Sequence, residues 1–255
     1  MNSLTNKKGL IIGVANDQSI AYGCAKHIHA AGGEVAITYL NHKAEPHVRP
    51  LAEKVNSPLI LPCNVQNPGE LEQVFEVVDK TWGSLDFVIH SIAFAPLADL
   101  HGRVTDCSVE GFLQAMDVSV HSLIRMTKLA EPLMKNGGSI LTMSYYGAQK
   151  VVENYNMMGP VKAALESVVQ YLAVELSEKA IRINTISPGP LKTRAASGIK
   201  DFDKLIAMAQ SRIANYDQIS IEDVGALAAF LVSDGAKALS GGTYFVDGGL
   251  NAVGA

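Results

Sequence analysis

GLIIGVANDQSIAYG, residues 9–23, decides the fold. A short apolar run enters a glycine turn at Gly13, and a helix-like stretch follows from residue 19 to residue 31. A strand, a tight turn and a helix N-terminus together seat a pyrophosphate, because backbone N–H groups and the helix dipole attract anionic oxygens. The usual G-x-G-x-x-G pattern would place glycine at positions 15 and 18, which hold Ala15 and Gln18 here. The segment therefore leaves a dinucleotide turn and plain helix capping by Ser19 both open.

Outward from this segment, short apolar runs alternate with helix-like stretches. Continuous β-branched runs of this kind indicate parallel strands that are covered on both faces. We therefore predict an α/β fold: one Rossmann-like domain over residues 1–255, with a doubly wound parallel sheet of about seven strands and helices on both faces. The expected strands are Leu10–Val14, Val35–Tyr39, Leu59–Leu61, Phe87–Ser91, Ser139–Met143, Arg182–Ile186 and Thr243–Val246, and the expected helices are 19–31, 43–55, 68–81, 109–134, 155–178 and 221–233.

One stretch, residues 187–219, breaks the alternation. It opens with SPGPL, continues with RAASGIKDFDK and has no strand character. Ligands of such sheets bind at the carboxyl ends of the strands, so a long insertion after a strand is a candidate substrate lid.

Composition excludes several other classes of protein. The 255 residues carry a formal charge of -4, with 48% hydrophobic and 18% charged residues, which is typical of a globular protein and argues against a nucleic-acid binder. The three cysteines form no Cys-x-x-Cys pair, and the N-terminus lacks a signal-peptide core or a membrane span. We expect a cytoplasmic protein with no membrane partner. The seven histidines do not form a set of metal ligands, so we predict no metal site.

Residues after the next strands are candidates for nucleotide contacts. No acidic residue stands near Leu40, where the adenosine ribose is usually bound, and the nearby cations are only His42 and Lys43. The choice between NADH and NADPH therefore stays open. Asn64 and Val65 are candidates to face the adenine, and residues 90–93 to lie along the nicotinamide; the alternative for each is a strand end that turns out of the core.

A tyrosine and a lysine supply candidate chemistry. Tyr155 and Lys162 are seven residues apart, so on one helix they would share a face, about 10 Å apart along the axis. The ammonium favours negative charge near the phenol and can also hold a ribose hydroxyl. The alternative is an ordinary half-buried helix, made irregular by Pro160.

With these residues in place, the chain resembles the bacterial NADH-dependent enoyl-[acyl-carrier-protein] reductases of the short-chain dehydrogenase/reductase superfamily. The resemblance covers about residues 9 to 250, nearly the whole chain. The matching segments are GVANDQSIAYG, HSIAFAP, SYYGAQKVVENYNMMGPVKAALE, RINTISPGPLKTRAASGIKDF, IEDVGALAAFLVSD and GGTYFVDGG.

One spacing is specific to this family. Superfamily members that reduce ketones carry Tyr-x3-Lys, with a serine thirteen residues before the tyrosine, and these positions hold Met158 and Tyr145 here. The enoyl reductases instead show Tyr-x6-Lys. In their reaction the hydride goes to the β-carbon while negative charge collects on the carbonyl oxygen, so the hydrogen-bond donor stands farther from the nicotinamide.

The resemblance implies the activity and the site. The protein would reduce the trans-2 double bond of enoyl thioesters on acyl carrier protein, by hydride transfer from NADH, in the last step of each fatty-acid elongation cycle. Tyr155 would donate to the enolate oxygen, Lys162 would bind the nicotinamide ribose, and Tyr145 would line the acyl pocket, together with Phe94 and Ala95. The other implied cofactor contacts are Gly13, Ser19, Ile20, Leu40, Asn64, Val65, Ile92, Leu191, Lys192, Thr193, Arg194 and Ala195.

The chain departs from the family at four positions. Asn64 replaces a common Asp, Ala93 a common Gly, Leu40 a polar residue and Arg194 an apolar one. These departures bear on nucleotide preference rather than on the presence of activity.

Two features concern partners. The stretch from Tyr155 to Leu176 is apolar around most of its circumference, which indicates burial on more than one side; the resemblance implies a homotetramer, and burial within one subunit is the alternative. The predicted lid has a local excess of positive charge, either a steering surface for an acidic carrier protein or a mixed solvated face. Its charged residues are Lys192, Arg194, Lys200, Asp201, Asp203 and Lys204.

Two other functions stay open from the residues alone. A short-chain dehydrogenase acting on a ketone or alcohol would need a phenol near position 158, where Met158 stands. A non-catalytic nucleotide-binding protein would use the turn without the chemistry of Tyr155 and Lys162.

Overall fold

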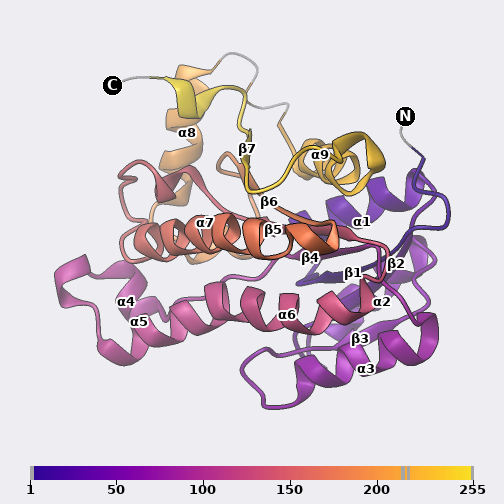
Figure 1. Cartoon of the computed structure of the whole chain (residues 1–255). Helices are drawn as coiled ribbons and strands as arrows, with labels where there is room; N and C mark the ends of the chain where they lie inside the picture. Colours follow the sequence, from indigo (N-terminus) through magenta and orange to yellow (C-terminus); the bar gives the residue numbers. More distant parts are fainter. Residues whose placement is uncertain (1–2, 214–215, 217–218, 254–255) are drawn as a thin grey trace.

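A single parallel sheet organises the computed structural model, which describes residues 3–213, 216 and 219–253 (Figure 1). The strand order is β3-β2-β1-β4-β5-β6-β7, and every neighbouring pair is parallel. The predicted seven-strand sheet is therefore confirmed. The strands are β1 Lys8–Ile12, β2 Glu34–Tyr39, β3 Ile60–Pro62, β4 Phe87–His90, β5 Gly138–Met143, β6 Ile181–Pro188 and β7 Thr243–Val246.

Helices cover both faces of the sheet, because side chains alternate along each buried strand. Leu10 and Ile12 of β1 pack into a cluster with α3, α6 and α7, whereas Ile11 packs with α1, α2 and α9. Figure 1 shows α1 and α9 side by side on one face and α6 and α7 on the other. The helices are α1 Ile20–Ala30, α2 Glu45–Lys54, α3 Glu70–Trp82, α4 Leu97–His101, α5 Val109–Met116, α6 Ser122–Ala130, α7 Met158–Glu175, α8 Phe202–Arg212 and α9 Ile221–Val232. Within the described residues, none of them is long and apolar enough to cross a membrane.

The helix predicted over residues 109–134 is not continuous. It consists of α5, a π-helical turn at Asp117–His121, and α6. Serine hydroxyls compete with the helical pattern here: Ser119 Oγ accepts from the Phe94 N–H (3.1 Å) and Ser122 Oγ donates to the Val118 carbonyl (2.7 Å). The short helix α4 was not predicted either.

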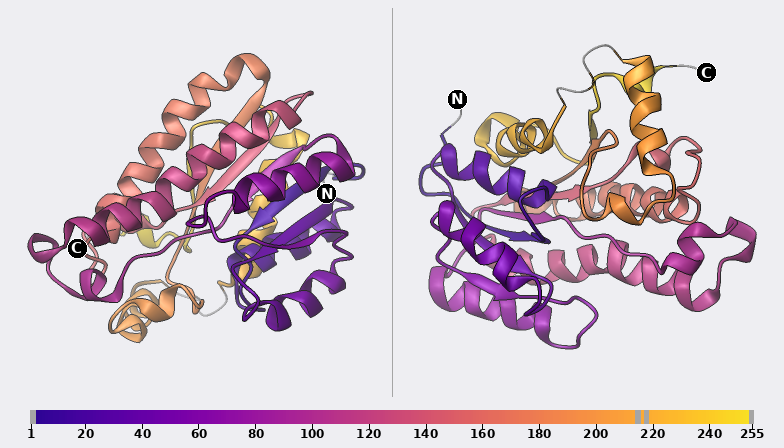
Figure 2. Two further views of the ribbon diagram at one scale, coloured as in Figure 1. Left: turned by 90° about the horizontal axis from the view of Figure 1, so that it is seen from below. Right: turned by 180° about the vertical axis from the view of Figure 1, so that it is seen from behind.

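The insertion predicted to begin at residue 187 begins later. Ser187 and Pro188 still belong to β6, because they pair with Phe245 and Val246 of β7. The remainder holds a 3-10 turn at Ala196–Gly198 and helix α8, and residues 214, 215, 217 and 218 lie outside the described part. Figure 2 shows α8 standing outside the two helical layers, at the same end of the molecule as α4 and α5.

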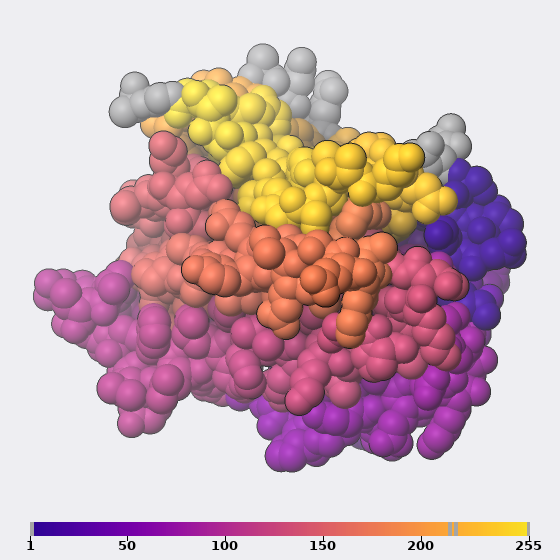
Figure 3. All heavy atoms as spheres, viewed as in Figure 1, coloured from indigo at the N-terminus to yellow at the C-terminus, as the bar shows by residue number. Residues whose placement is uncertain are grey.

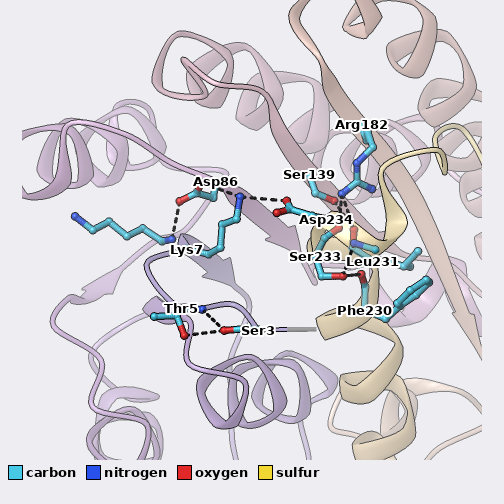
Figure 4. A network of polar contacts seen from close by, with 12 residues as sticks. Ser3, Thr5, Lys7, Asp86, Ser139, Arg182, Phe230, Leu231, Ser233 and Asp234 are labelled. Carbon is cyan, nitrogen blue, oxygen red and sulfur yellow. Dashed lines mark hydrogen bonds and ion pairs between the residues drawn. The ribbon is translucent and has the colours of Figure 1, made fainter. Parts of the chain in front are cut away.

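Polar contacts fasten the opposite edge of the sheet, where the strands begin (Figure 4). The Lys8 N–H donates to Asp86 Oδ2 (2.8 Å), which ties the start of β1 to the residue before β4. Arg182 Nη2 of β6 donates to the Leu231 carbonyl of α9 (2.9 Å). Hydrogen bonds thus stabilise the amino ends of the strands. A ligand site is expected at the other end, in the loops that follow the carboxyl ends of the strands.

Candidate active site

A pocket that opens to solvent lies at the carboxyl ends of the strands, and the empty space between its walls and at its mouth is about 920 Å³. Its walls come from the start of α1, the segments after β4, β5 and β6, the start of α7, and α8. It brings together nine of the residues predicted from the sequence: Ile20, Ile92, Ala95, Tyr145, Tyr155, Lys162, Leu191, Thr193 and Ala195. Phe94, predicted for the acyl side, also lines it.

The other predicted residues do not line this pocket. Gly13 and Ser19 lie in the turn before Ile20. Leu40 follows β2, while Asn64 and Val65 follow β3, so they sit farther along the same edge of the sheet. Lys192 and Arg194 are exposed in the segment after β6. Contact of these residues with a nucleotide stays a prediction.

The turn after β1 is shaped by backbone contact. Gly13 has a φ of +112°, and a Cβ at this position would lie 2.1 Å from the Ser91 carbonyl oxygen. A side chain is therefore excluded, and the backbone itself forms the surface next to the segment after β4. Asp17 is exposed, so its carboxylate is able to point to solvent and away from a pyrophosphate bound at the turn.

Ser19 occupies the N-cap position of α1, but the side-chain cap considered from the sequence does not form. Its hydroxyl makes no bond to a helix N–H. It accepts instead from the N–H groups of Ala15 and Asn16, both at 3.0 Å, because the preceding turn curls back over it. Ser19 therefore holds the shape of the turn.

Tyr155 does not share a helix with Lys162, contrary to prediction. The helix α7 begins only at Met158, because Asn154 and Asn156 adopt left-handed conformations with φ of 62° and 43°. Pro160 falls in the first turn, where its missing N–H is tolerated. The phenol is thus placed by a turn rather than by helical spacing, and both side chains still line the pocket.

Aromatic packing holds the Tyr155 ring. The ring centroids of Tyr145 and Tyr155 are 4.9 Å apart at an interplanar angle of 68°. A Cβ on Gly147 would lie 2.5 Å from Tyr155 Cδ1, so the segment after β5 packs directly on the ring. Burial raises the pKa of the Tyr155 phenol, and the negative charge of Glu166 raises it further. The phenol is therefore a neutral hydrogen-bond donor.

Lys162 is a buried cation in the wall of the pocket, 5% exposed. Its Nζ donates to the Met143 carbonyl at the end of β5 (2.7 Å). Burial lowers the pKa of Lys162 to about 8, and the charge of Glu166 opposes that shift. At neutral pH the group is an ammonium with three donors, of which Met143 takes one.

His90 lies in the core instead of along the pocket. It is fully buried, with Nδ1 2.9 Å from Thr142 Oγ1 and Nε2 2.8 Å from Ser122 Oγ. Burial lowers its pKa to about 3, so the ring is neutral. The pocket wall begins at the next residue, Ser91.

Three polar residues were not among the predicted site residues: Ser144, which lines the pocket, and its neighbours Glu166 and Gln149. Ser144 Oγ donates to Glu166 Oε1 (2.6 Å), and Gln149 Nε2 donates to Glu166 Oε2 (3.0 Å). One signal was available, since a residue four positions after Lys162 lies on the same helix face.

The fold and the site define a class of protein. A doubly wound sheet, a nucleotide-type turn after its first strand, and a tyrosine and a lysine in a pocket at the carboxyl edge define an oxidoreductase of the short-chain dehydrogenase/reductase class.

Comparison with known proteins narrows the class to a family. The model of the family described as enoyl-(acyl carrier protein) reductase matches residues 13–251, and the chain belongs to that family. It is 46% identical to an enoyl-[acyl-carrier-protein] reductase [NADH] of Aquifex aeolicus, over 100% of this chain and 94% of the relative. One from Rhizobium meliloti is 42% identical, over 98% of this chain and 92% of the relative. A crystal structure of the Anaplasma phagocytophilum reductase in complex with NAD has a TM-score of 0.94 and 46% identity, covering 100% of this chain and 98% of that one.

Proposed function

We propose that this chain reduces the trans-2 double bond of enoyl thioesters on acyl carrier protein, with NADH as hydride donor, in the last step of each fatty-acid elongation cycle. The observation that carries the proposal is the placement of Tyr155 and Lys162 in one pocket. Where ketone-reducing relatives have their tyrosine and serine, this chain has Met158 and Tyr145, which also line it.

The residues present suit NADH. Gly13 allows the tight turn before α1 to pack against the Ser91 carbonyl, and the Lys162 ammonium keeps donors for a ribose diol. NADH supplies the hydride when bound. Besides Gly13 and Lys162, the residues proposed to hold it are Ser19, Ile20, Leu40, Asn64, Val65, Ile92, Leu191, Lys192, Thr193, Arg194 and Ala195.

Tyr155 is the proposed donor to the substrate. As the double bond is reduced, negative charge collects on the thioester carbonyl oxygen, and a preorganised O–H stabilises that charge. The phenol stays protonated because burial raises its pKa. Tyr145 and Ala95 are proposed to line the acyl side of the pocket.

The segment after β6 is the proposed lid, and its charges suit an acidic carrier protein. Lys192 lies 3.3 Å from Asp203, and Lys204 lies 3.0 Å from Asp201. Among the described residues, Arg194 and Lys200 form no ion pair, so the local excess of positive charge stays free to attract acidic groups.

The chain is proposed to form a homotetramer. Tyr171 and Val174 of α7 are 77% and 75% exposed, although both carry large apolar surfaces. Helix α7 crosses the middle of the face drawn in Figure 3, where a second chain can reach it. Sedimentation equilibrium of the full chain is expected to give the mass of four chains, and a monomer at all concentrations would contradict the proposal.

Turnover tests the proposed function directly. With crotonyl thioester, the purified chain is expected to consume NADH, and NADPH more slowly, because no arginine directly follows β2. Absorbance of the reduced nucleotide measures both rates. Oxidation of secondary alcohols without enoyl reduction would instead indicate a ketone or alcohol dehydrogenase, and nucleotide binding without turnover would indicate a non-catalytic protein.

A further inference from the structure

A buried carboxylate lies near Tyr155 and Lys162 and affects the pKa of both. Glu166 lies one turn after Lys162 on α7 and is 9% exposed. Among the described residues it forms no ion pair. Its two oxygens accept only from neutral donors, the Ser144 hydroxyl at 2.6 Å and the Gln149 amide at 3.0 Å. A buried carboxylate that forms no direct ion pair is costly, so a specific role is expected for it.

The two donors mark the ends of one segment. Ser144 directly follows β5, and Gln149 directly follows the 3-10 turn Tyr146–Ala148. This segment, residues 144–149, contains Tyr145 and also Gly147, which packs on the Tyr155 ring. Glu166 therefore ties both ends of the segment to the helix that carries Lys162.

The same helix also holds the residue that directly precedes this segment. Lys162 Nζ donates to the carbonyl of Met143, the residue before Ser144. If the segment moved away from α7, it would displace the Tyr145 ring and the surface on which Tyr155 rests. We therefore expect the placement of the phenol relative to the ammonium to depend on these three hydrogen bonds.

The carboxylate also acts on charge. Burial lowers the pKa of Lys162 and raises that of Tyr155, and the nearby negative charge of Glu166 raises both. It thus favours the ammonium and the neutral phenol together. The other titratable groups near Lys162 are the neutral His90, whose pKa the ammonium lowers further, and the phenols of Tyr145 and Tyr155, which line the same pocket.

We propose that Glu166 is a positioning residue of this enzyme: its carboxylate fastens residues 144–149 to α7 and keeps Lys162 charged for NADH binding. The proposal rests on the function proposed above.

Glu166→Gln tests the effect of charge. A glutamine keeps the shape and can still accept from Ser144, while the ammonium loses its neighbouring anion. The dissociation constant of NADH, measured by fluorescence titration between pH 6.5 and 9.5, is expected to rise at lower pH than in the wild type, with roughly tenfold weaker binding at pH 8.5. Glu175→Gln, on the exposed side of the same helix, is expected to leave the profile unchanged.

Ser144→Ala tests the fastening and does not depend on the folding of the first variant. It keeps the charge but removes one tether, so kcat with crotonyl thioester is expected to fall roughly three- to tenfold while the pH profile of NADH binding stays that of the wild type. A Glu166→Gln profile that superimposes on the wild type, or an unchanged kcat in Ser144→Ala, overturns the proposal. A wild-type chain that binds NADH without reducing enoyl thioesters contradicts the proposed function instead.

Discussion

Tyr155→Phe is expected to lower kcat with crotonyl thioester by about two orders of magnitude or more, because one preorganised donor to a developing oxyanion contributes that much. The phenylalanine ring keeps the packing against Tyr145 and Gly147, so only the hydroxyl is removed. The dissociation constant of NADH is expected to stay at its wild-type value, because Lys162 is untouched. Steady-state kinetics and fluorescence titration measure the two effects separately.

Tyr145→Phe provides the matched control. Its ring lies in the same aromatic cluster, and burial also raises the pKa of its hydroxyl. We place it along the acyl chain and not at the carbonyl oxygen, so its loss of kcat is expected to be tenfold or less, below that of a full oxyanion donor. If Tyr155→Phe keeps wild-type turnover, or if Tyr145→Phe is the more damaged of the two, the assignment of the donor is wrong.

The sheet was predictable because its five inner strands are short and mostly buried runs rich in apolar residues, whereas the outermost strands β3 and β7 are only half-buried. The strand positions were less certain. The first strand was expected at Leu10–Val14 and lies at Lys8–Ile12, because the charged Lys8 pairs with Glu34 at the edge where the strands begin. The apolar pattern shows which residues are buried. Strand pairing also includes the polar residue before the apolar run, so the pattern alone does not give the bounds of the strand.

The pairing of Tyr155 with Lys162 was predictable, but its geometry was not. The prediction from residue spacing placed both side chains on one helix. In the structure, Asn154 and Asn156 adopt left-handed conformations, and the helix begins only after them. Glu166 was overlooked for a related reason: in a sequence, a helical glutamate resembles a solvated charge, and only the tertiary structure brings Ser144 and Gln149 to it.

Lys162→Met is expected to weaken NADH binding by roughly 10- to 100-fold, since a hydrogen bond from a charged group contributes about 1.5–3 kcal/mol. Methionine keeps an apolar stem of similar length and removes the ammonium. In the wild type, the pKa of about 8 means that the ammonium is present below that pH and is lost above it. Affinity for NADH is therefore expected to fall as pH rises through 8, and the variant is expected to show a weak, flat profile.

Stability without NADH supplies an independent measurement of the same group. Burial places the folded-state pKa of Lys162 at about 8, below its ordinary value of 10.5, so between these values the unfolded chain holds a proton that the folded chain has released. The free energy of unfolding in wild type therefore contains a contribution from Lys162 that rises with pH from about 8 to 10.5. Urea unfolding measures this free energy at each pH. In Lys162→Met the contribution is expected to be absent, whereas the matched variant Lys150→Met, at an exposed lysine, is expected to keep it. Identical pH profiles of stability and of NADH binding in Lys162→Met and wild type would show that Lys162 is neither the buried cation of the site nor its contact to the nucleotide.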